Sequence, residues 1–460
     1  MPRPQPKNTA QLPSATDLPL NAILSRLVKN SAYLLSGNTL ADLCTMAALA
    51  LTARKLGPEI FGTFVLIQTY AFIISQLLNF QSWQALIKFG AEKLEHQNGA
   101  EFVDLISLCY FLDFAVAILA TALALLLINT VAAWYGWNEV TATMASAYSL
   151  TILFSVTDTS IGILQIFNKF KLLAAQNIAV SLSKLVLVLG AFFLNGGVWS
   201  FIAIWMGCGA FSAILLLTMG WRVLSRKFDH PVRPLASLQP ALADNQGLLG
   251  FLTTTNLHSS IRLASRELDV MIIGAFLGPA SAGMLKIVKQ IASLFTRIAS
   301  PLYNAIYPEF ASLWAAQEID RITALVVRSF FIAFVPSIIF WLGLVAFGKP
   351  AIIFFLGASY APLFVTAVVY NLAVLIAVIT FSFHPLMLTL GKASQSLLIL
   401  TLSTAAYFLL LVLLLKSMDM LGVAISYLLF YIIWSALMGL SIHYYLGRAR
   451  LAISKKHREP

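Results

Sequence analysis

Basic side chains occur inside long apolar runs of this sequence, where they could bind an anion. A charged side chain at the centre of a membrane helix costs about 2.5–3.5 kcal/mol, so it normally faces the interior of the protein. Guanidinium and ammonium groups together suit an anion with several oxygens, such as a phosphate or a pyrophosphate. We therefore predict an anion-binding cavity lined by Arg262, Lys286, Lys289, Lys184, Asn256 and Arg297.

The segment around Arg262 is unusually polar for an apolar helix. It contains Thr253-Thr254-Thr255-Asn256 and His258-Ser259-Ser260. A helix with this density of polar groups must line water, a polar substrate or another polar surface on one side. Internal pairing is the alternative for Arg266, Glu267 and Asp269, which are close enough in sequence to form ion pairs on one helix. Arg297 lies nearer the end of its run, from which its long side chain can also extend to the interface.

Acidic residues occupy similar positions in the first half. Asn38, Asp42 and Thr45 share one face of a helix. Asp42 fits either a coupling site for a proton or sodium ion or a charge partner for a cavity lysine. Asp158 and Asp113 lie in the inner third of their runs and are weaker candidates for the same roles. No catalytic motif, phosphate-binding loop or metal-ligand spacing accompanies these residues, so we predict neither an enzyme nor a resident cofactor.

The elements that position these charges are membrane helices. The chain has 460 residues, of which 59% are hydrophobic and only 11% charged. Soluble domains carry roughly 45–50% apolar and about 25% charged residues. A transmembrane helix needs about 20 apolar residues, and the sequence supplies about twelve such runs. We predict an all-α polytopic membrane protein with spans at 32–53, 60–80, 104–132, 141–166, 172–194, 198–221, 248–276, 280–304, 325–347, 361–388, 394–415 and 420–446.

The positive charges predict how these spans are oriented. The net charge is +11, and the lysines and arginines concentrate in alternate connections. Arg222, Arg226 and Lys227 share one such connection, whereas Lys349 and Lys416 are isolated on the opposite side. Basic residues mark cytoplasmic loops, so both termini are predicted to be cytoplasmic. The same distribution argues against nucleic acid as a partner and leaves membrane lipids as the surroundings of the chain.

A short motif is repeated in the two halves. Leu56-Gly57-Pro58 followed by Gly62 recurs as Leu277-Gly278-Pro279 followed by Gly283, each time between an outward and an inward span. The chain is therefore predicted to consist of two lobes of six helices each, related by an axis along the membrane normal. The predicted divisions are a disordered or interfacial N-terminus, an N-lobe, a cytoplasmic linker, a C-lobe and a basic tail, at 1–30, 31–222, 223–246, 247–446 and 447–460.

Several stretches of the sequence resemble the polysaccharide transporters, which include the O-antigen and exopolysaccharide flippases. This family belongs to the superfamily that also holds the MATE drug exporters and the lipid II flippase. The resemblance runs through nearly the whole chain from about residue 32. Its clearest stretches are Thr52–Gly62, Gln81–Gly90, Leu268–Val270 with Leu277–Pro279, and Ile306–Glu309.

The resemblance implies a MATE-like fold in the bacterial inner membrane. It also implies transport of an undecaprenyl-diphosphate-linked oligosaccharide between the leaflets, and an association with polysaccharide assembly proteins. The anion-binding cavity fits this substrate, because a sugar diphosphate loses hydration in hydrocarbon and needs polar partners there. The alternative is a cation-coupled multidrug exporter of the MATE type, and acidic residues such as Asp42 would serve it better than the basic second half does. Whether protons, sodium ions or neither drive transport is left open.

Overall fold

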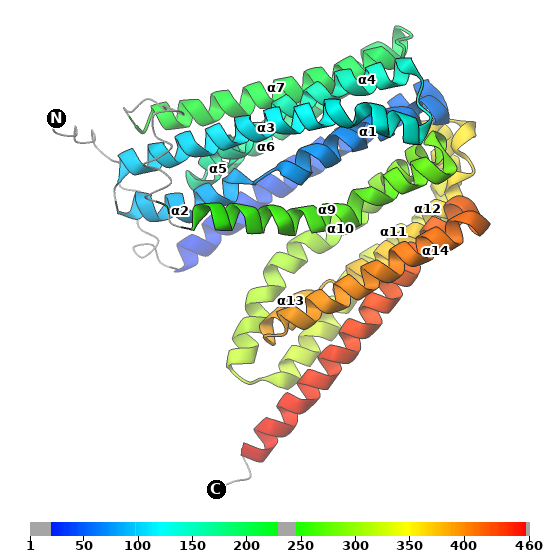
Figure 1. Cartoon of the computed structure of the whole chain (residues 1–460). Coiled ribbons are helices and arrows are strands. Elements are labelled where there is room, and N and C mark those ends of the chain that lie inside the picture. The colour runs from blue at the N-terminus through cyan, green and yellow to red at the C-terminus, as the bar shows by residue number, and fades with distance from the viewer. Residues whose placement is uncertain (1–19, 97, 229–244, 246, 457–460) are drawn as a thin grey trace, which may run out of the picture. The chain divides into compact units, whose positions relative to one another are not determined.

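The computed structural model describes residues 20–96, 98–228, 245 and 247–456, and the regular elements in these ranges are helices (Figure 1). Side chains are described from Gly37 onward, with some exceptions in α9 and α10 and near the C-terminus. In chain order the helices are α1 Leu20–Leu78, α2 Ser82–Glu95, α3 Gly99–Tyr135, α4 Glu139–Ser149, η1 Leu150–Ser155, α5 Asp158–Ile166, α6 Phe170–Phe193, α7 Val198–Ser225, α9 Leu248–Leu277, α10 Pro279–Ala315, α11 Ile319–Leu356, η2 Ala358–Tyr360, α12 Leu363–Ile379, α13 Phe383–Thr389 and α14 Ala393–Lys456.

Helix makes up most of every predicted span, and the span predicted at 361–388 is divided into α12 and α13 by a turn at 380–382. The first two spans form α1, which bends at Gly57, and the last two form α14, which bends at Asp419. The span predicted at 141–166 consists of α4, η1 and α5, because a short 3₁₀ segment interrupts it. Eight segments among the described residues are long and apolar enough to cross a membrane, and the two longest contain the bends. The all-α, multi-span fold is confirmed.

The repeated Leu-Gly-Pro motif adopts the same backbone conformation in both copies. Gly57 has φ 73° and ψ 167°, and Gly278 has φ 86° and ψ 172°. This region of the Ramachandran map is accessible almost only to glycine. In each copy, the proline that follows occupies the start of the next helix, where its missing N–H is tolerated. The two copies are therefore equivalent in three dimensions as well as in sequence.

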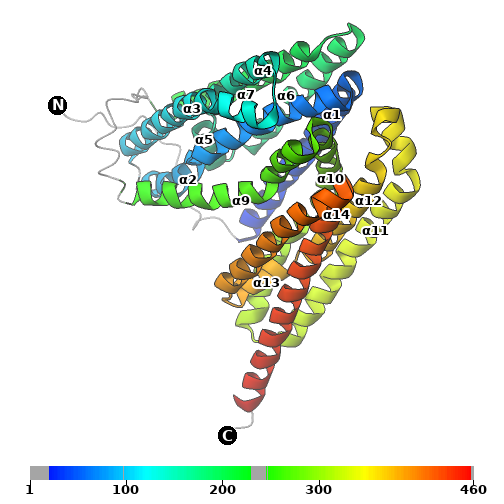
Figure 2. The same cartoon turned by 45° about the vertical axis from the view of Figure 1, so that its right-hand side comes forward.

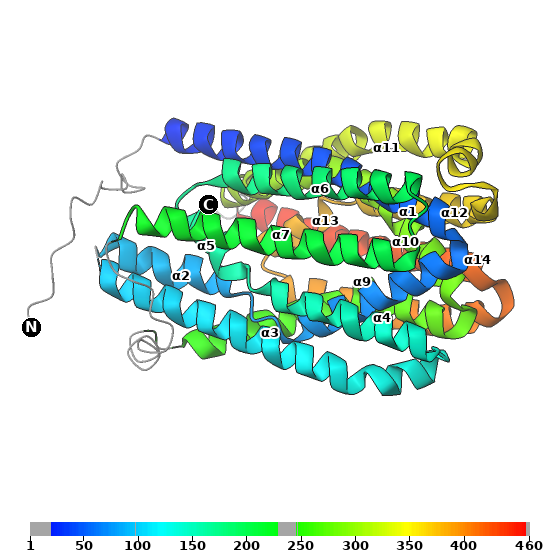
Figure 3. The same cartoon turned by 90° about the horizontal axis from the view of Figure 1, so that it is seen from above.

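The chain separates into two compact units, one ending at Pro279 and the other beginning at Ala280. In unit 1, α6 packs between α1 and α7, and α9 packs against α1 and α2. Figure 3 shows α6 running alongside α7. A buried core of this unit joins α2, α3, α5 and α7 around Phe102, Ile106 and Ile163, and α6 and α9 also contribute to it. α9 was predicted as the first span of the second half of the chain, and it packs against helices of the first half. The predicted lobe boundaries stay predictions.

Unit 2 contains α10 to α14. α12 packs against both α11 and α14, and α13 packs against α14; Figure 2 shows α11, α12 and α14 in this unit. The interface of α12 with α14 is aromatic. The rings of Tyr370 and Tyr427 stack with their centroids 4.2 Å apart, and Tyr407 meets Tyr427 edge-on. Offset and edge-to-face ring pairs of this kind stabilise a packed interface.

Candidate functional site

A polar seam joins α1 and α6 in unit 1. The side-chain amide of Asn177 donates a hydrogen bond to Oδ1 of Asn38 over 2.8 Å. About two turns farther along α1 and one turn farther along α6, the hydroxyls of Thr45 and Ser181 lie 3.2 Å apart. Asp42 lies between Asn38 and Thr45 on the same face of α1, because residues three and four apart share a helix face. We call the residues Asn38, Asp42, Thr45, Asn177, Ser181 and Lys184 the α1–α6 seam.

Lys184 extends this seam toward α7. It follows Ser181 by three residues, and its side chain is half-buried. Its ammonium group lies 5.4 Å from the ring centroid of Trp205 on α7 and close enough to Cys208 for an electrostatic interaction. An aromatic face attracts a cation, with a larger effect where water is excluded. The structure therefore places a lysine, held against tryptophan, inside a candidate membrane-spanning segment.

A second polar cluster surrounds the break between α1 and α2. Here the backbone leaves the helix at 79–81, and Gln81 has φ 50°. Asp113 from α3 supports both this break and the start of α5. Its Oδ1 accepts a hydrogen bond from the Ser82 hydroxyl over 2.6 Å. Its Oδ2 accepts two more, from the Thr159 backbone N–H at 3.0 Å and the Thr159 hydroxyl at 2.7 Å.

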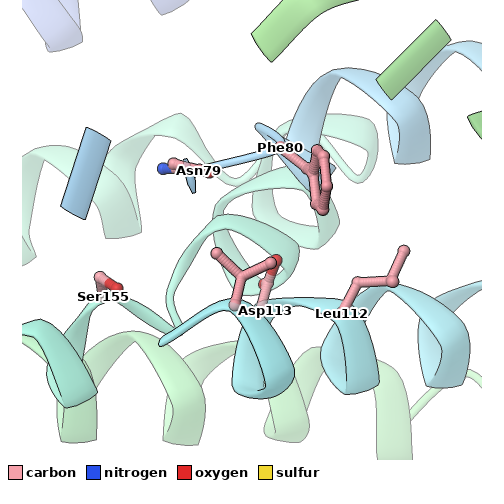
Figure 4. A pocket seen from close by; sticks show the side chains of 6 residues that line it. Asn79, Phe80, Leu112, Asp113 and Ser155 are labelled. Atoms are coloured by element: carbon pink, nitrogen blue, oxygen red, sulfur yellow. The ribbon is translucent and has the colours of Figure 1, made fainter. Parts of the chain in front are cut away.

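Asp158, the first residue of α5, lies beside Asp113. The Asn79 side chain hydrogen-bonds Asp158, and the two carboxylates are close enough to interact electrostatically. A small pocket lined by Asn79, Phe80, Leu112, Asp113, Val116 and Ser155 lies next to them, with space for about one water molecule. In Figure 4, Leu112 and Asp113 on α3 face the segment that carries Asn79 and Phe80.

The polar stretch of α9 binds this same break. The side-chain amide of Asn256 donates to the backbone carbonyls of Leu77, at 3.1 Å, and Asn79, at 2.7 Å. The amide of Gln81 in turn donates to the hydroxyl of Ser259. Leu77 and Asn79 lie where α1 ends, so their carbonyls lack the usual partner four residues later. In unit 1, the polar side of α9 therefore faces backbone carbonyls that the end of α1 leaves without a helical partner.

The structure brings some predicted site residues together and separates others. Asn38, Asp42 and Lys184 belong to the α1–α6 seam, whereas Asp158 and Asn256 belong to the cluster around the α1–α2 break. Lys286 and Lys289 lie on α10 in unit 2, three residues apart on one face, with half-buried side chains. Arg262 and Arg297 lie on α9 and α10, but their side chains are outside the described residues, as are those of His258 and Arg266.

Sequence reasoning missed three contributors to these sites: Asn177, Ser181 and Asn79. The first two could have been found from their spacing, because with Lys184 they repeat at steps of four and three and so mark one face of α6. The sequence gave no such signal for Asn79, because its role depends on the residues that other helices place beside it. Among the described residues, no group of three or more His, Cys, Asp and Glu side chains could hold a metal ion.

The fold and these sites define a multi-pass α-helical membrane protein of the MATE-like class. A family profile described as "Polysaccharide biosynthesis protein" matches residues 27–314, so the chain belongs to this family, as its motifs predicted. Inner membrane protein YghQ of Escherichia coli (strain K12) is 27% identical over 338 residues, which cover 73% of this chain and 93% of YghQ.

Solved structures with the same fold are transporters. An inward-facing multidrug resistance MATE family transporter of the MOP superfamily matches with a TM-score of 0.72 at 12% identity, covering 89% of this chain and 95% of that one. The lipid II flippase MurJ in an inward closed conformation matches with a TM-score of 0.67 at 16% identity, covering 91% and 90%. These likenesses confirm the MATE-like fold, and the chain is a multi-pass membrane protein of the polysaccharide biosynthesis family.

Proposed function

We propose that this protein is a flippase that moves an undecaprenyl-diphosphate-linked oligosaccharide from the cytoplasmic to the periplasmic leaflet of the bacterial inner membrane by alternating access. The observation that carries the proposal is Lys184, a half-buried lysine on a polar seam within a candidate membrane span. A diphosphate needs cationic donors to replace its hydration inside a bilayer. Membership in the polysaccharide biosynthesis family supports a lipid-linked sugar as the substrate.

Further cations support an anionic substrate. Lys286 and Lys289 lie on one face of α10, at a spacing that lets both ammonium groups contact the same ligand. Arg262 and Arg297 extend this basic character to α9 and to the following part of α10. We propose that each of these basic side chains contacts the diphosphate during transport. The polyprenyl tail stays in the lipid.

A cation-coupled exporter of the MATE type is the second candidate. It is favoured by Asp42, an acidic residue on the seam, and by the likeness to MATE transporters. In that case Asp42 would carry a proton or a sodium ion and Lys184 would be its charge partner. The two candidate functions differ in their need for Lys286 and Lys289. A flippase of an anionic lipid would need both lysines, whereas an exporter of cationic drugs would not.

We also propose that both termini are cytoplasmic and that neither an enzymatic step nor a resident cofactor is involved. The basic connections support this orientation, because lysine and arginine are retained on the cytoplasmic side of membrane proteins. Attaching a phosphatase or a fluorescent reporter to the C-terminus tests it directly. A periplasmic C-terminus would reverse the direction of every span.

Deletion of the gene, followed by extraction of lipid-linked sugars, tests the main proposal. We expect the lipid-linked precursor to accumulate with its headgroup facing the cytoplasm, and a plasmid copy of the gene to remove it. A plasmid carrying Lys286→Ala with Lys289→Ala, or Arg262→Ala, should fail to do so although the protein is made and inserted. Lys349→Ala, which alters an exposed lysine on α11, is the matched control.

The outcomes separate the two functions. An unchanged pool of lipid-linked sugars in the deletion strain, together with increased sensitivity to cationic drugs, would favour the exporter. Full rescue by the double alanine variant would remove the diphosphate assignment from Lys286 and Lys289 and leave Arg262 and the α1–α6 seam as proposed binding residues.

A further inference from the structure

Asp113 and Asp158 form a pair of acids within candidate membrane spans that has no cationic partner among the described side chains. Neither carboxylate makes an ion pair there, and the interactions of each are with neutral groups and with the other acid. Two neighbouring negative charges repel strongly in a medium of low dielectric constant. A pair of this kind therefore retains a proton on one of its members.

The hydrogen bonds favour Asp113 as the ionised member. Asp113 accepts from three donors, which are the hydroxyl of Ser82 and both the N–H and the hydroxyl of Thr159. An ionised carboxylate is acceptor-only and accepts all three bonds, whereas a protonated one requires the hydroxyl of Ser82 or of Thr159 to accept its hydrogen instead. We therefore assign the charge of the pair to Asp113.

Asp158 has the opposite environment. Its Oδ2 is buried and has no hydrogen-bond partner in the described part of the chain. A buried carboxylate oxygen that carries charge and receives no donor is strongly unfavourable. A neutral carboxyl group reduces that cost. Asn79, which hydrogen-bonds Asp158, also lines the water-sized pocket together with Asp113 and Ser155. A single water molecule in this pocket supplies a route for a proton.

We propose that Asp113 and Asp158 together bind one exchangeable proton, carried by Asp158, and that its release loosens the break between α1 and α2. The proton passes to water, leaving two carboxylates that repel each other. Asp158 is bonded to Asn79, just before the break, and Asp113 is bonded to Ser82, just after it. Repulsion between the acids therefore acts across the break. This site is separate from the α1–α6 seam, and its existence does not rest on the proposed substrate.

Among the described side chains, the other titratable groups near the pair are a thiol and a phenol; the side chains of His258 and Arg262 on α9 lie outside this set. Cys109 and Tyr110 on α3 lie close to Asp113, and the Tyr110 hydroxyl is 2.8 Å from the hydroxyl of Ser160 on α5. On the α7 side, Gly220 packs against Ser160, and on the α9 side, Asn256 contacts the break. None of these groups supplies a positive charge that would let both acids ionise.

Infrared spectroscopy of the full-length protein in lipid nanodiscs tests the proton directly. We expect a carboxylic-acid C=O band at neutral pH that shifts in D₂O and disappears in Asp158→Asn. Glu139→Gln, which alters an exposed acid at the start of α4, should leave the band unchanged. Asp158→Glu should retain a band at a shifted frequency, which keeps the test valid if the asparagine variant folds poorly. A wild-type spectrum without this band, or a band that sodium ions remove, would overturn the proposal.

Hydrogen exchange at the break tests the second half of the proposal. After correction for intrinsic rates, amides in the 78–84 segment of the wild type should lose about tenfold protection as the pH rises through the titration of the infrared band. A tenfold change corresponds to 1.4 kcal/mol, within the range of like-charge repulsion in a protein. Asp158→Asn cannot ionise and should keep its protection. Parallel loss of protection in both proteins would show that the break does not respond to this proton.

Discussion

The amide of Asn177 donates a hydrogen bond to Oδ1 of Asn38 over 2.8 Å, and this bond ties together two helices that are far apart in the sequence. Buried amides of this kind fix the rotation of one membrane helix against its neighbour, because any other rotation leaves polar groups in hydrocarbon. Asp42 and Lys184 share the faces that this bond brings together. Their positions are thus set by neutral residues whose own role is structural.

Lys184 should be essential for transport but not for folding. Charged hydrogen bonds contribute about 1.5–3 kcal/mol, so Lys184→Met should reduce transport by roughly ten- to a hundredfold. Lys184→Arg retains the charge and should retain part of the activity. The measurement is the pool of lipid-linked precursor in a deletion strain that carries each variant. Lys416→Met, which changes an exposed lysine on α14, is the control. Equal pools in the Lys184→Met and control strains would contradict the assignment.

Replacement of Asn256 should destabilise the end of α1. Asn256→Ala removes the donor to two backbone carbonyls, Leu77 and Asn79, and a hydrogen bond of this kind contributes about 0.5–1.5 kcal/mol. We expect a lower unfolding temperature in detergent and faster exchange of amides in the 77–81 segment. Thr253→Ala, an exposed position on α9 that bonds only to its own helix, should change neither. Identical exchange in both variants would rule out the capping role.

Asp113→Ala should be the most destabilising single change around the break. It removes the acceptor of three hydrogen bonds at once, leaving the Ser82 hydroxyl and two groups of Thr159 unpaired. At about 1–3 kcal/mol for each donor, the loss amounts to several kcal/mol. Thermal unfolding and the yield of inserted protein measure it. Asp320→Ala on α11 removes a carboxylate that is 89% exposed, so it should leave both quantities nearly unchanged, and a comparable loss there would contradict the prediction.

Gly278→Ala should strain the turn that joins α9 to α10. At φ 86° and ψ 172° a residue with a Cβ is disfavoured by about 1–3 kcal/mol. Gly57→Ala should behave alike, because Gly57 has nearly the same backbone angles. Gly343→Ala is the control, since it lies inside α11 with open space around the added methyl group. Denaturation in detergent should show lower stability for the first two variants only. Equal stability of all three would mean that the turn relaxes.

Much of this fold could be predicted from the sequence, because apolar runs of about 20 residues have few alternatives to forming membrane helices. The turn at each Leu-Gly-Pro repeat could also be predicted, since proline fixes its own φ angle and cannot donate a backbone hydrogen bond. Asn38 and Asp42 could be placed on a common face by periodicity alone. The span predicted at 60–80 ends at the 79–81 break, but the sequence could not show that Asn256, which lies far along the chain, donates to the carbonyls freed there.

The role of Asn256 illustrates the other limit. Its polarity within an apolar run indicated an unusual environment, but the pattern did not distinguish a ligand from a neighbouring backbone as its partner. Similarly, the positions of Asp113 and Asp158 in their spans predicted weaker candidates than Asp42, yet Asp113 makes three hydrogen bonds and Asp158 is its neighbour. Partners supplied by other helices decide what a buried polar group does, and a single sequence does not contain that pairing.

The packing of α9 with the preceding helices has a practical consequence for how the polypeptide can be divided. A protease cut within 229–244 would leave α9 covalently continuous with α10 and still held by hydrogen bonds to Leu77 and Asn79. The nicked halves should therefore copurify without their covalent link. For the same reason, two gene fragments divided at that point should reassemble when they are coexpressed.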